Sequence, residues 1–343
     1  MDTVNQSLRA ITEAASDAVG QVLALDPIGG GHNSQVFRAS TADGRVYALK
    51  VYPRGTSDRR DRLGNESDSL RFLWKHGIRQ IPETILVDRQ QGFALYEYID
   101  GQQVPIREVT ERDIDAAIDF LTNLQRLTGL PESQSLRAAS EAFFEGEAIV
   151  ENLSVRLERF HITRQEEPEL AAFLDRDLIP ALDQFTVWSK ARLGESWNEP
   201  LPAAQRILSP SDFGFHNALR TSDRALTFVD FEYFGWDDPA KTISDFLLHP
   251  AMPLTLAFRQ RFALGVAARL GQPVRERVLA VYPLFGLKWC LICMNEFLPA
   301  YRHRHAVSLD TDAWDGVKSF QLSKARAILN RITSEHEHFP YFG

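Results

Sequence analysis

Three polar residues in the segment 208–235 have the types and spacing that transfer of a phosphoryl group to a hydroxyl requires. Asp212 is followed five residues later by Asn217, and Asp230 comes after a short hairpin in an apolar strand. A carboxylate can orient the attacking hydroxyl and accept its proton, while an amide oxygen and a second carboxylate can hold Mg²⁺ against the phosphates of ATP. This chemistry predicts Asp212 as the catalytic residue and Asn217 and Asp230 as metal ligands.

The tripeptide 212–214 permits a second interpretation, because it spells the metal-binding Asp-Phe-Gly of protein kinases. A metal-binding Asp212 would need a catalytic Asp-x4-Asn loop about twenty residues upstream. Residues 189–204 contain no Asp. Strands expected over 218–220 and 225–231, joined by a polar turn, instead place Asp230 directly after the Asp212 loop. The spacing favours the catalytic loop, although an Asp-x4-Asn pair alone is a weak signal because both residues favour turns.

Residues 21–52 read as three strands separated by turns, and the first turn contains Gly29, Gly30 and Gly31. Glycines allow backbone N–H groups to approach phosphates closely. The segment after the glycines has no helical period and no Gly-Lys-Ser/Thr follows, which argues against a P-loop and against a dinucleotide-binding fold. The functional interpretation is a hairpin that covers ATP, and the alternative is a loose hairpin turn.

Lys50 lies on the third of these strands, two residues after Ala48, so the two side chains share a face. An ammonium group between apolar neighbours needs an anionic partner if it is partly buried. It could reach the phosphates of ATP, or it could be an edge-strand Lys with its head in water. A helix predicted over 62–75 places Glu66 on an apolar face, where it is either the partner of Lys50 or one more solvated charge.

Two further strands are expected over 84–88 and 92–99, and a helix over 8–23 leads into the first strand. The pattern beyond these elements is mainly helical and begins with a capping box at Thr110. We therefore predict an α+β, bilobal protein-kinase-like fold. Residues 1–98 form a small β-rich nucleotide-binding lobe of about five strands and one helix, and residues 99–343 form a large helical lobe with the catalytic loop, metal site and acceptor pocket.

Over roughly positions 20–250 the sequence resembles the aminoglycoside phosphotransferase and choline-kinase-like family of small-molecule kinases. The string after Asp230 is closer to this family than to eukaryotic protein kinases, and no Ala-Pro-Glu activation segment follows it. The resemblance rests on the segments 29–34, 48–50, 65–73, 95–101, 212–217 and 229–239.

The resemblance implies ATP and Mg²⁺ as cofactors, with the same roles for Asp212, Asn217 and Asp230. It also implies that Lys50 and Glu66 position the phosphates and that backbone groups between Glu97 and Ile99 hold adenine. The ATP-binding residues expected on this basis are Gly30, Gly31, Asn33, Ser34, Lys50, Glu66, Glu97 and Ile99.

The chain departs from the family pattern in two places. Pro210 and Ser211 stand where the family usually has His-Gly before the catalytic Asp, and that His normally braces the loop. Thr242 stands where an Asp usually follows Asp-Pro, with Asp245 one turn later. Neither change removes a group expected to touch metal or phosphate, so a divergent subfamily with retained chemistry is expected.

Polar residues in two apolar segments are candidates for the acceptor pocket. One segment is a helix predicted over 282–297, and the other follows the metal strand. These residues either line a pocket or mark the edge where the chain meets water. The basic run 302–305 could contact an anionic acceptor or belong to a solvated loop. The candidate acceptor-binding residues are Trp236, Asp237, Lys288, Asn295 and Glu296.

A net charge of −8 opposes nonspecific binding to nucleic acid or to an anionic membrane. Apolar runs are shorter than the roughly 18 residues of a transmembrane helix, and the first residues lack the basic region of a signal peptide. We therefore expect a cytoplasmic monomer or homodimer. Cys290 and Cys293 form a C-x2-C pair. Their helical spacing among apolar residues favours two buried thiols over a zinc or redox site.

The leading hypothesis is an ATP- and Mg²⁺-dependent kinase that phosphorylates a hydroxyl of a small molecule, such as a sugar, amino sugar or amino alcohol. One alternative is a nucleotide-binding pseudokinase that serves as a scaffold, which the missing His-Gly motivates. Another is a kinase that acts on a protein or a carrier-linked glycan, which the missing activation segment disfavours.

Overall fold

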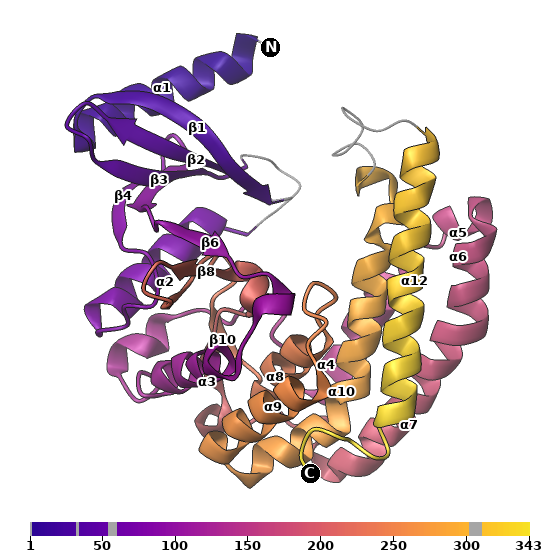
Figure 1. Cartoon of the computed structure of the whole chain (residues 1–343). Helices are drawn as coiled ribbons and strands as arrows, with labels where there is room; N and C mark the ends of the chain where they lie inside the picture. The colour runs from indigo at the N-terminus through magenta and orange to yellow at the C-terminus, as the bar shows by residue number, and fades with distance from the viewer. Residues whose placement is uncertain (1, 32–33, 54–59, 302–310) are drawn as a thin grey trace. The chain divides into compact units, whose positions relative to one another are not determined.

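A computed structural model of the chain describes residues 2–31, 34–53, 60–301 and 311–343 (Figure 1). The chain divides into two compact units. Unit 1 comprises residues 1–108, 126–140 and 210–235, and unit 2 comprises residues 109–125, 141–209 and 236–343. The predicted Asp212 loop and the segment with Asp230 therefore belong to the same unit as the N-terminal sheet. The predicted lobe boundary after residue 98 stays a prediction.

Unit 1 is built on a five-stranded antiparallel sheet in the order β1-β2-β3-β5-β4. Burial alternates along β2, which suits a sheet that packs one face against a helix, whereas four consecutive residues of β5 are buried. The five predicted strands are thus confirmed. Their bounds are β1 Val22–Gly31, β2 Ser34–Thr41, β3 Val46–Val51, β4 Thr84–Asp88 and β5 Phe93–Glu97.

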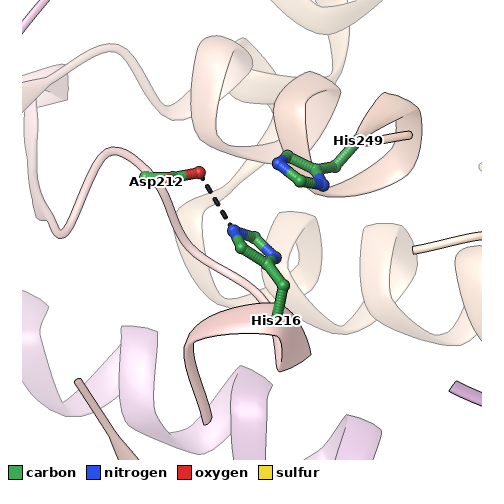
Figure 2. Close-up of side chains that lie close together, drawn as sticks. All are labelled: Asp212, His216 and His249. Carbon is green, nitrogen blue, oxygen red and sulfur yellow. Dashed lines mark hydrogen bonds and ion pairs between the residues drawn. The ribbon is translucent and has the colours of Figure 1, made fainter. Parts of the chain in front are cut away.

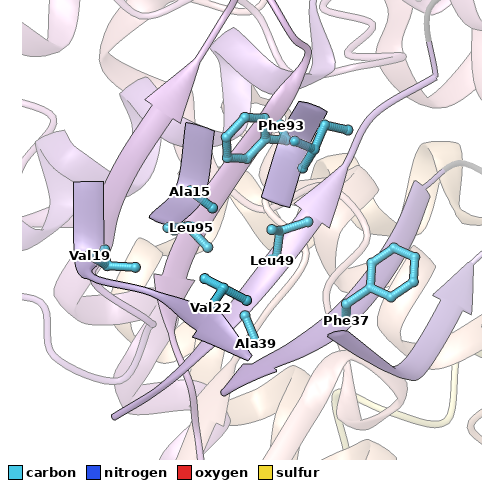
Figure 3. Close-up of a cluster of buried hydrophobic side chains, with 9 residues drawn as sticks. Ala15, Val19, Val22, Phe37, Ala39, Leu49, Phe93 and Leu95 are labelled. Atoms are coloured by element: carbon cyan, nitrogen blue, oxygen red, sulfur yellow. The ribbon is translucent and has the colours of Figure 1, made fainter. Parts of the chain in front are cut away.

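Helix α1 (Asp2–Val19) packs against one face of this sheet (Figure 3). Ile11, Ala15 and Val19 follow one another at four-residue spacing and form one buried stripe. The stripe packs on strand residues such as Leu49 and Leu95. Because side chains alternate along a strand, Lys50 must point to the opposite face of the sheet.

Helix α2 (Arg62–Lys75) occupies the predicted range. Asp61 caps it by accepting a hydrogen bond from the backbone N–H of Gly64 at 2.9 Å, which satisfies one of the free donors of the first turn. Glu66, Leu70 and Leu73 are all buried and lie on adjacent turns of one face. Unit 1 therefore contains both α1 and α2.

A second antiparallel sheet in unit 1, in the order β6-β8-β9, carries the predicted site loops. The strand expected to continue to residue 231 ends at Phe228, and this part of the prediction is wrong. Asp230 adopts a left-handed backbone with φ 68°, which no regular strand contains. The bounds are β6 Gly101–Gln103, β8 Ala218–Thr221 and β9 Leu226–Phe228, with short 3₁₀ helices η1 Ile106–Glu108, η2 Pro131–Ser135 and η6 Phe215–Asn217.

Unit 2 is mainly helical, as predicted. Thr110 and Asp113 form the expected capping box at the start of α3, with each side chain bonding the other residue's backbone N–H. The longer elements are α3 Glu111–Gln125, α4 Gly146–Glu158, α7 Ile179–Leu193, α8 Pro239–Leu248, α9 Leu256–Leu270, α10 Gln272–Cys293 and α12 Thr311–Glu335. The shorter ones are α5 Thr163–Glu166, α6 Pro168–Phe173, a π-helical turn η3 Leu174–Leu178, 3₁₀ helices η4 Gly194–Trp197, η5 Ala203–Gln205 and η7 Met294–Phe297, and the paired strands β7 Ile207–Ser209 and β10 Gly235–Asp237.

Helix α10 forms the centre of unit 2 and packs against α4, α7, α8, α9 and α12. The stretch Gln272–Phe297 is long and apolar enough to cross a membrane by composition, but 83% of its most apolar window is buried inside the protein. Burial by neighbouring helices explains its apolar character. Cys290 and Cys293 are buried on this helix as free thiols, as predicted.

Candidate active site

Lys50, Glu66 and Asp230 form one hydrogen-bonded cluster in unit 1. The Lys50 ammonium donates to Glu66 Oε2 and to Asp230 Oδ1, both at 2.7 Å. Lys50 is only 6% exposed, and such burial disfavours its charged form. The charges of Glu66 and Asp230 outweigh this effect and raise the pKa of Lys50 above its ordinary value, so the ammonium stays charged at neutral pH. The ion pair expected between Lys50 and Glu66 is therefore present.

Glu66 binds donors with both of its carboxylate oxygens. Besides Lys50, the hydroxyl of Tyr52 donates to Oε2 at 2.7 Å, and the backbone N–H of Phe231 donates to Oε1 at 3.2 Å. The Tyr52 and Tyr96 hydroxyls are 2.7 Å apart, and burial raises the pKa of both well above the usual value. The Glu66 carboxylate is thus held by Lys50 and Tyr52 at Oε2 and by the backbone of the Asp230 segment at Oε1.

The first two turns of α2 also hold the backbone that follows Asp230. Nδ2 of Asn65 donates to the carbonyl oxygens of Glu232 and Phe234, each at 3.0 Å. Arg62 forms a buried ion pair with Glu232 and donates to the Tyr233 hydroxyl at 2.7 Å. These tertiary contacts account for the left-handed backbone of Asp230, because they bind the chain directly after β9 and prevent the strand from continuing.

Carboxylate oxygens of Glu66, Asp230 and Glu232 all lie within 4.8 Å of one another. Burial, and then the nearby charge of Asp230, raise the pKa of Glu232. Like charges this close favour a bound cation, and oxygen donors are what Mg²⁺ prefers. Glu232 was not predicted as a site residue, although its place two residues after Asp230 was a usable signal.

Both oxygens of the Asp212 carboxylate accept hydrogen bonds from residues further along the same loop. Nε2 of His216 lies 3.0 Å from Oδ1 (Figure 2), and Nδ2 of Asn217 lies 3.3 Å from Oδ2. Nδ2 of Asn217 also donates to the backbone carbonyl of Asp212 at 3.0 Å. Because that carbonyl can only accept, the NH₂ group of Asn217 faces it and the amide oxygen remains as a ligand atom.

The Asp212 loop and the Asp230 segment are joined through the backbone. The N–H of Val229 donates to the carbonyl oxygen of Asn217 at 2.9 Å. The two predicted metal ligands therefore come from segments that are hydrogen-bonded to each other. The loop is also braced at Ser211, whose hydroxyl donates to the carbonyl of Ser140 at 3.0 Å. Ser211 has φ 70°, a left-handed conformation that a glycine would adopt more easily.

The glycine hairpin and the segment before β6 hold the remaining predicted ATP-binding residues. Gly30 pairs with Gln35 and Gly31 with Ser34 across the β1–β2 ladder, whereas Asn33 lies outside the described residues. Glu97 ends β5, where its N–H donates to the carbonyl of Glu83 at 2.8 Å. Ile99 follows, and its carbonyl accepts from the N–H of Gly101 at 2.9 Å.

The predicted acceptor residues all lie in unit 2, and two of them belong to a buried network of charges. Asp237 accepts a hydrogen bond from Lys241 at 2.9 Å, and Lys288 donates to Asp245 at 2.9 Å. Nζ of Lys241 lies 3.3 Å from Oδ2 of Asp245, and this ion pair links the other two. Burial raises the pKa of Asp237 to about 6 and lowers that of Lys288.

The other acceptor candidates lie close in sequence to members of this network. Trp236 precedes Asp237 in β10, and Asn295 and Glu296 lie in η7, where Asn295 is buried. The basic run 302–305 lies outside the described residues. The acceptor role of all these residues stays a prediction.

Comparison with known proteins places the chain in a family. The model of the phosphotransferase enzyme family matches residues 24–281, so the chain belongs to that family, as the resemblance predicted. A search of curated protein sequences found no match.

Solved structures with the same fold include kinases of small molecules. Choline kinase LicA from Streptococcus pneumoniae is 16% identical with a TM-score of 0.63, covering 95% of this chain and 99% of that chain. Spectinomycin phosphotransferase, solved with ADP and spectinomycin, is 13% identical with a TM-score of 0.64, covering 93% and 98%. Ethanolamine kinase from Plasmodium vivax is 14% identical with a TM-score of 0.56, covering 90% and 83%. These similarities confirm the predicted bilobal kinase-like fold.

Proposed function

We propose that the chain is an ATP- and Mg²⁺-dependent kinase that transfers a phosphoryl group to a hydroxyl of a small molecule. The observation that carries this proposal is the cluster in which Lys50 binds both Glu66 and Asp230. A charged ammonium held between these carboxylates is suited to binding phosphates next to a metal ligand. Membership in the phosphotransferase enzyme family supports the proposal.

Oxygen donors from Asn217 and Asp230 fit Mg²⁺, and Glu232 adds a further carboxylate nearby. Bound there, Mg²⁺ would neutralise charge on the phosphates of ATP. Lys50 would contact the phosphates, and Glu66 would keep its ammonium in place. The glycine hairpin (Gly30, Gly31 and Ser34, together with Asn33) and the backbone of residues 97–99 would complete the nucleotide site.

Asp212 would accept a hydrogen bond from the acceptor hydroxyl and take its proton as the new O–P bond forms and the bond from the γ-phosphorus to the bridging oxygen breaks, which releases ADP. Its side chain is 35% exposed, which leaves it accessible to a hydroxyl. The contribution of the protein would be positioning and electrostatic stabilisation.

The acceptor class we propose is a sugar, an amino sugar or an amino alcohol. Proteins of the same fold whose names or bound ligands include choline, ethanolamine and spectinomycin support this class. The net charge of −8 suits a cationic acceptor. The test is a panel of these compounds, each incubated with the chain, ATP and Mg²⁺, with ADP release and product mass measured. Acceptor-dependent ADP release with a gain of one phosphate in the product supports the proposal.

A nucleotide-binding pseudokinase is the second candidate, favoured by Pro210-Ser211 in place of His-Gly. Nucleotide binding without ADP release across the panel would support it. A third candidate is a kinase acting on a protein or a carrier-linked glycan, and adding such acceptors to the panel separates it from the first.

A further inference from the structure

His216 lies next to the proposed catalytic carboxylate but has no part in the assignments above. The chain passes from Asp212 through Gly214 into η6 (Phe215–Asn217), and this turn brings His216 back to Asp212. Nε2 of His216 lies 3.0 Å from Oδ1 of Asp212, as Figure 2 shows. The His216 side chain is 14% exposed, so the contact is largely shielded from water.

The His216 contact completes a two-point support of the carboxylate. Asn217 binds the other oxygen, Oδ2, at 3.3 Å and the backbone carbonyl of Asp212 at 3.0 Å. Contacts on both oxygens hold the plane of the carboxylate more firmly than contacts on one oxygen, because they resist its rotation. A general base works only when its accepting lone pair is aimed at the hydroxyl, so a fixed plane has a direct effect on rate.

His216 is itself anchored from outside the loop. Nε2 of the Gln103 side chain, on β6, donates to the carbonyl oxygen of His216 at 3.0 Å. Strand β6 pairs with β8, which follows Asn217 directly. Pro210 has no side-chain group that could brace the loop before Asp212. The contacts from Asp212 to His216 and from His216 to Gln103 on β6 join the loop to the β6-β8-β9 sheet and can serve this purpose instead.

We infer that His216 is a positioning residue for Asp212, holding the carboxylate in the orientation that accepts the proton of the acceptor hydroxyl. The inference rests on the proposed function. It concerns the rate of the chemical step and not the binding of nucleotide, because His216 contacts the carboxylate and is not among the residues proposed to bind ATP.

The test compares three variants with the unmutated chain, using the acceptor that the panel identifies. His216→Ala removes the donor, His216→Gln restores an N–H at similar reach, and His76→Ala is a matched control. His76 makes a similar contact, Nε2 to Glu132 Oε2 at 2.9 Å, with residues outside the proposed site.

We expect His216→Ala to lower kcat by on the order of 10- to 100-fold, with KM for ATP changed less than about twofold. His216→Gln should recover a large part of kcat, and His76→Ala should keep kcat within about twofold of the unmutated chain. An unchanged kcat in His216→Ala would overturn the inference. Equal losses in His216→Ala and His216→Gln, together with a lower Tm, would show a merely structural role and overturn it as well.

A readout independent of activity is the ¹⁵N spectrum of the histidine rings. Substituting Asp212→Ala should shift the Nε2 resonance of His216 and leave that of His76 unchanged, and no shift would contradict the contact. An unmutated chain that shows the contact in this spectrum but phosphorylates no acceptor would refute the proposed function instead. The two failures are therefore distinguishable.

Discussion

Lys50 and Asp230 are 180 positions apart in the sequence, and the ammonium of the first donates to Oδ1 of the second at 2.7 Å. Lys50 comes from the five-stranded sheet, and Asp230 comes from the chain just after β9. Because of this contact, a proposed phosphate-binding group and a proposed metal ligand already lie next to each other within unit 1. Such preorganisation lowers the cost of assembling the site when the nucleotide binds.

Asp230→Ala is expected to abolish the Mg²⁺ dependence of ATP binding and to reduce turnover. A carboxylate that binds the metal acts on both the ground state and the transition state, so affinity and rate should fall together. Titration calorimetry with ATP, with and without Mg²⁺, measures the first effect. Equal ATP affinity in both conditions for the unmutated chain would refute the assignment of Asp230.

Asn217→Ala should lower turnover by on the order of 100-fold or more, as for removal of one preorganised electrostatic contact. Part of the loss should return when the Mg²⁺ concentration is raised, because the weakened site can still be filled. Initial rates over a range of Mg²⁺ concentrations provide the measurement. If Asn217→Ala has almost no effect in an active enzyme, the Asp212-Phe213-Gly214 metal motif becomes the better interpretation.

Asn65→Ala removes the amide that binds the carbonyls of Glu232 and Phe234, and it should destabilise the protein by on the order of 1–2 kcal/mol. It should also raise the Mg²⁺ concentration needed for half-maximal activity, because the Asp230 segment loses a support. Asp68→Ala is the matched control, since Asp68 lies on the same helix but is exposed and pairs with Arg89. Equal Mg²⁺ requirements in the two variants would contradict this role.

The buried thiols predict a loss of stability at alkaline pH. Burial raises the pKa of Cys293 from 9.0 to about 11. Between these values the unfolded thiol loses its proton while the folded one keeps it, so the free energy of unfolding should fall as pH rises. Denaturant titrations at pH 9 and 11 should show that the free energy of unfolding falls less between these pH values in Cys293→Ala than in the unmutated chain. The same fall in both proteins would show that Cys293 contributes nothing.

Local sequence patterns predicted those parts of the fold that depend on periodicity or on local capping. The two-residue period of a strand placed Lys50 on the same face of β3 as Ala48, and the helical period of α2 placed Glu66 on an apolar side. The capping box at Thr110 marked the start of α3. Each of these features depends on residues within a few positions of one another, so a single sequence contains the information.

The remaining features of the site depend on contacts between distant segments. The end of β9 was predicted too late because Asn65 and Glu66 bind the following backbone, and nothing near Asp230 in the sequence indicates that. His216 was missed because a residue next to Asn217 reads as part of the loop. The sequence also did not show that Asp237 and Lys288 share a buried network, since Lys241 and Asp245 connect them through the fold.

The most direct test of the kinase proposal is Asp212→Ala, assayed for ATP binding and for transfer in parallel. We predict that the unmutated chain phosphorylates at least one acceptor of the panel, and that Asp212→Ala binds Mg²⁺ and ATP with nearly unchanged affinity but transfers no phosphate. The reason is that orienting the hydroxyl is separate from holding the nucleotide. Turnover by Asp212→Ala close to that of the unmutated chain would contradict the catalytic role of Asp212.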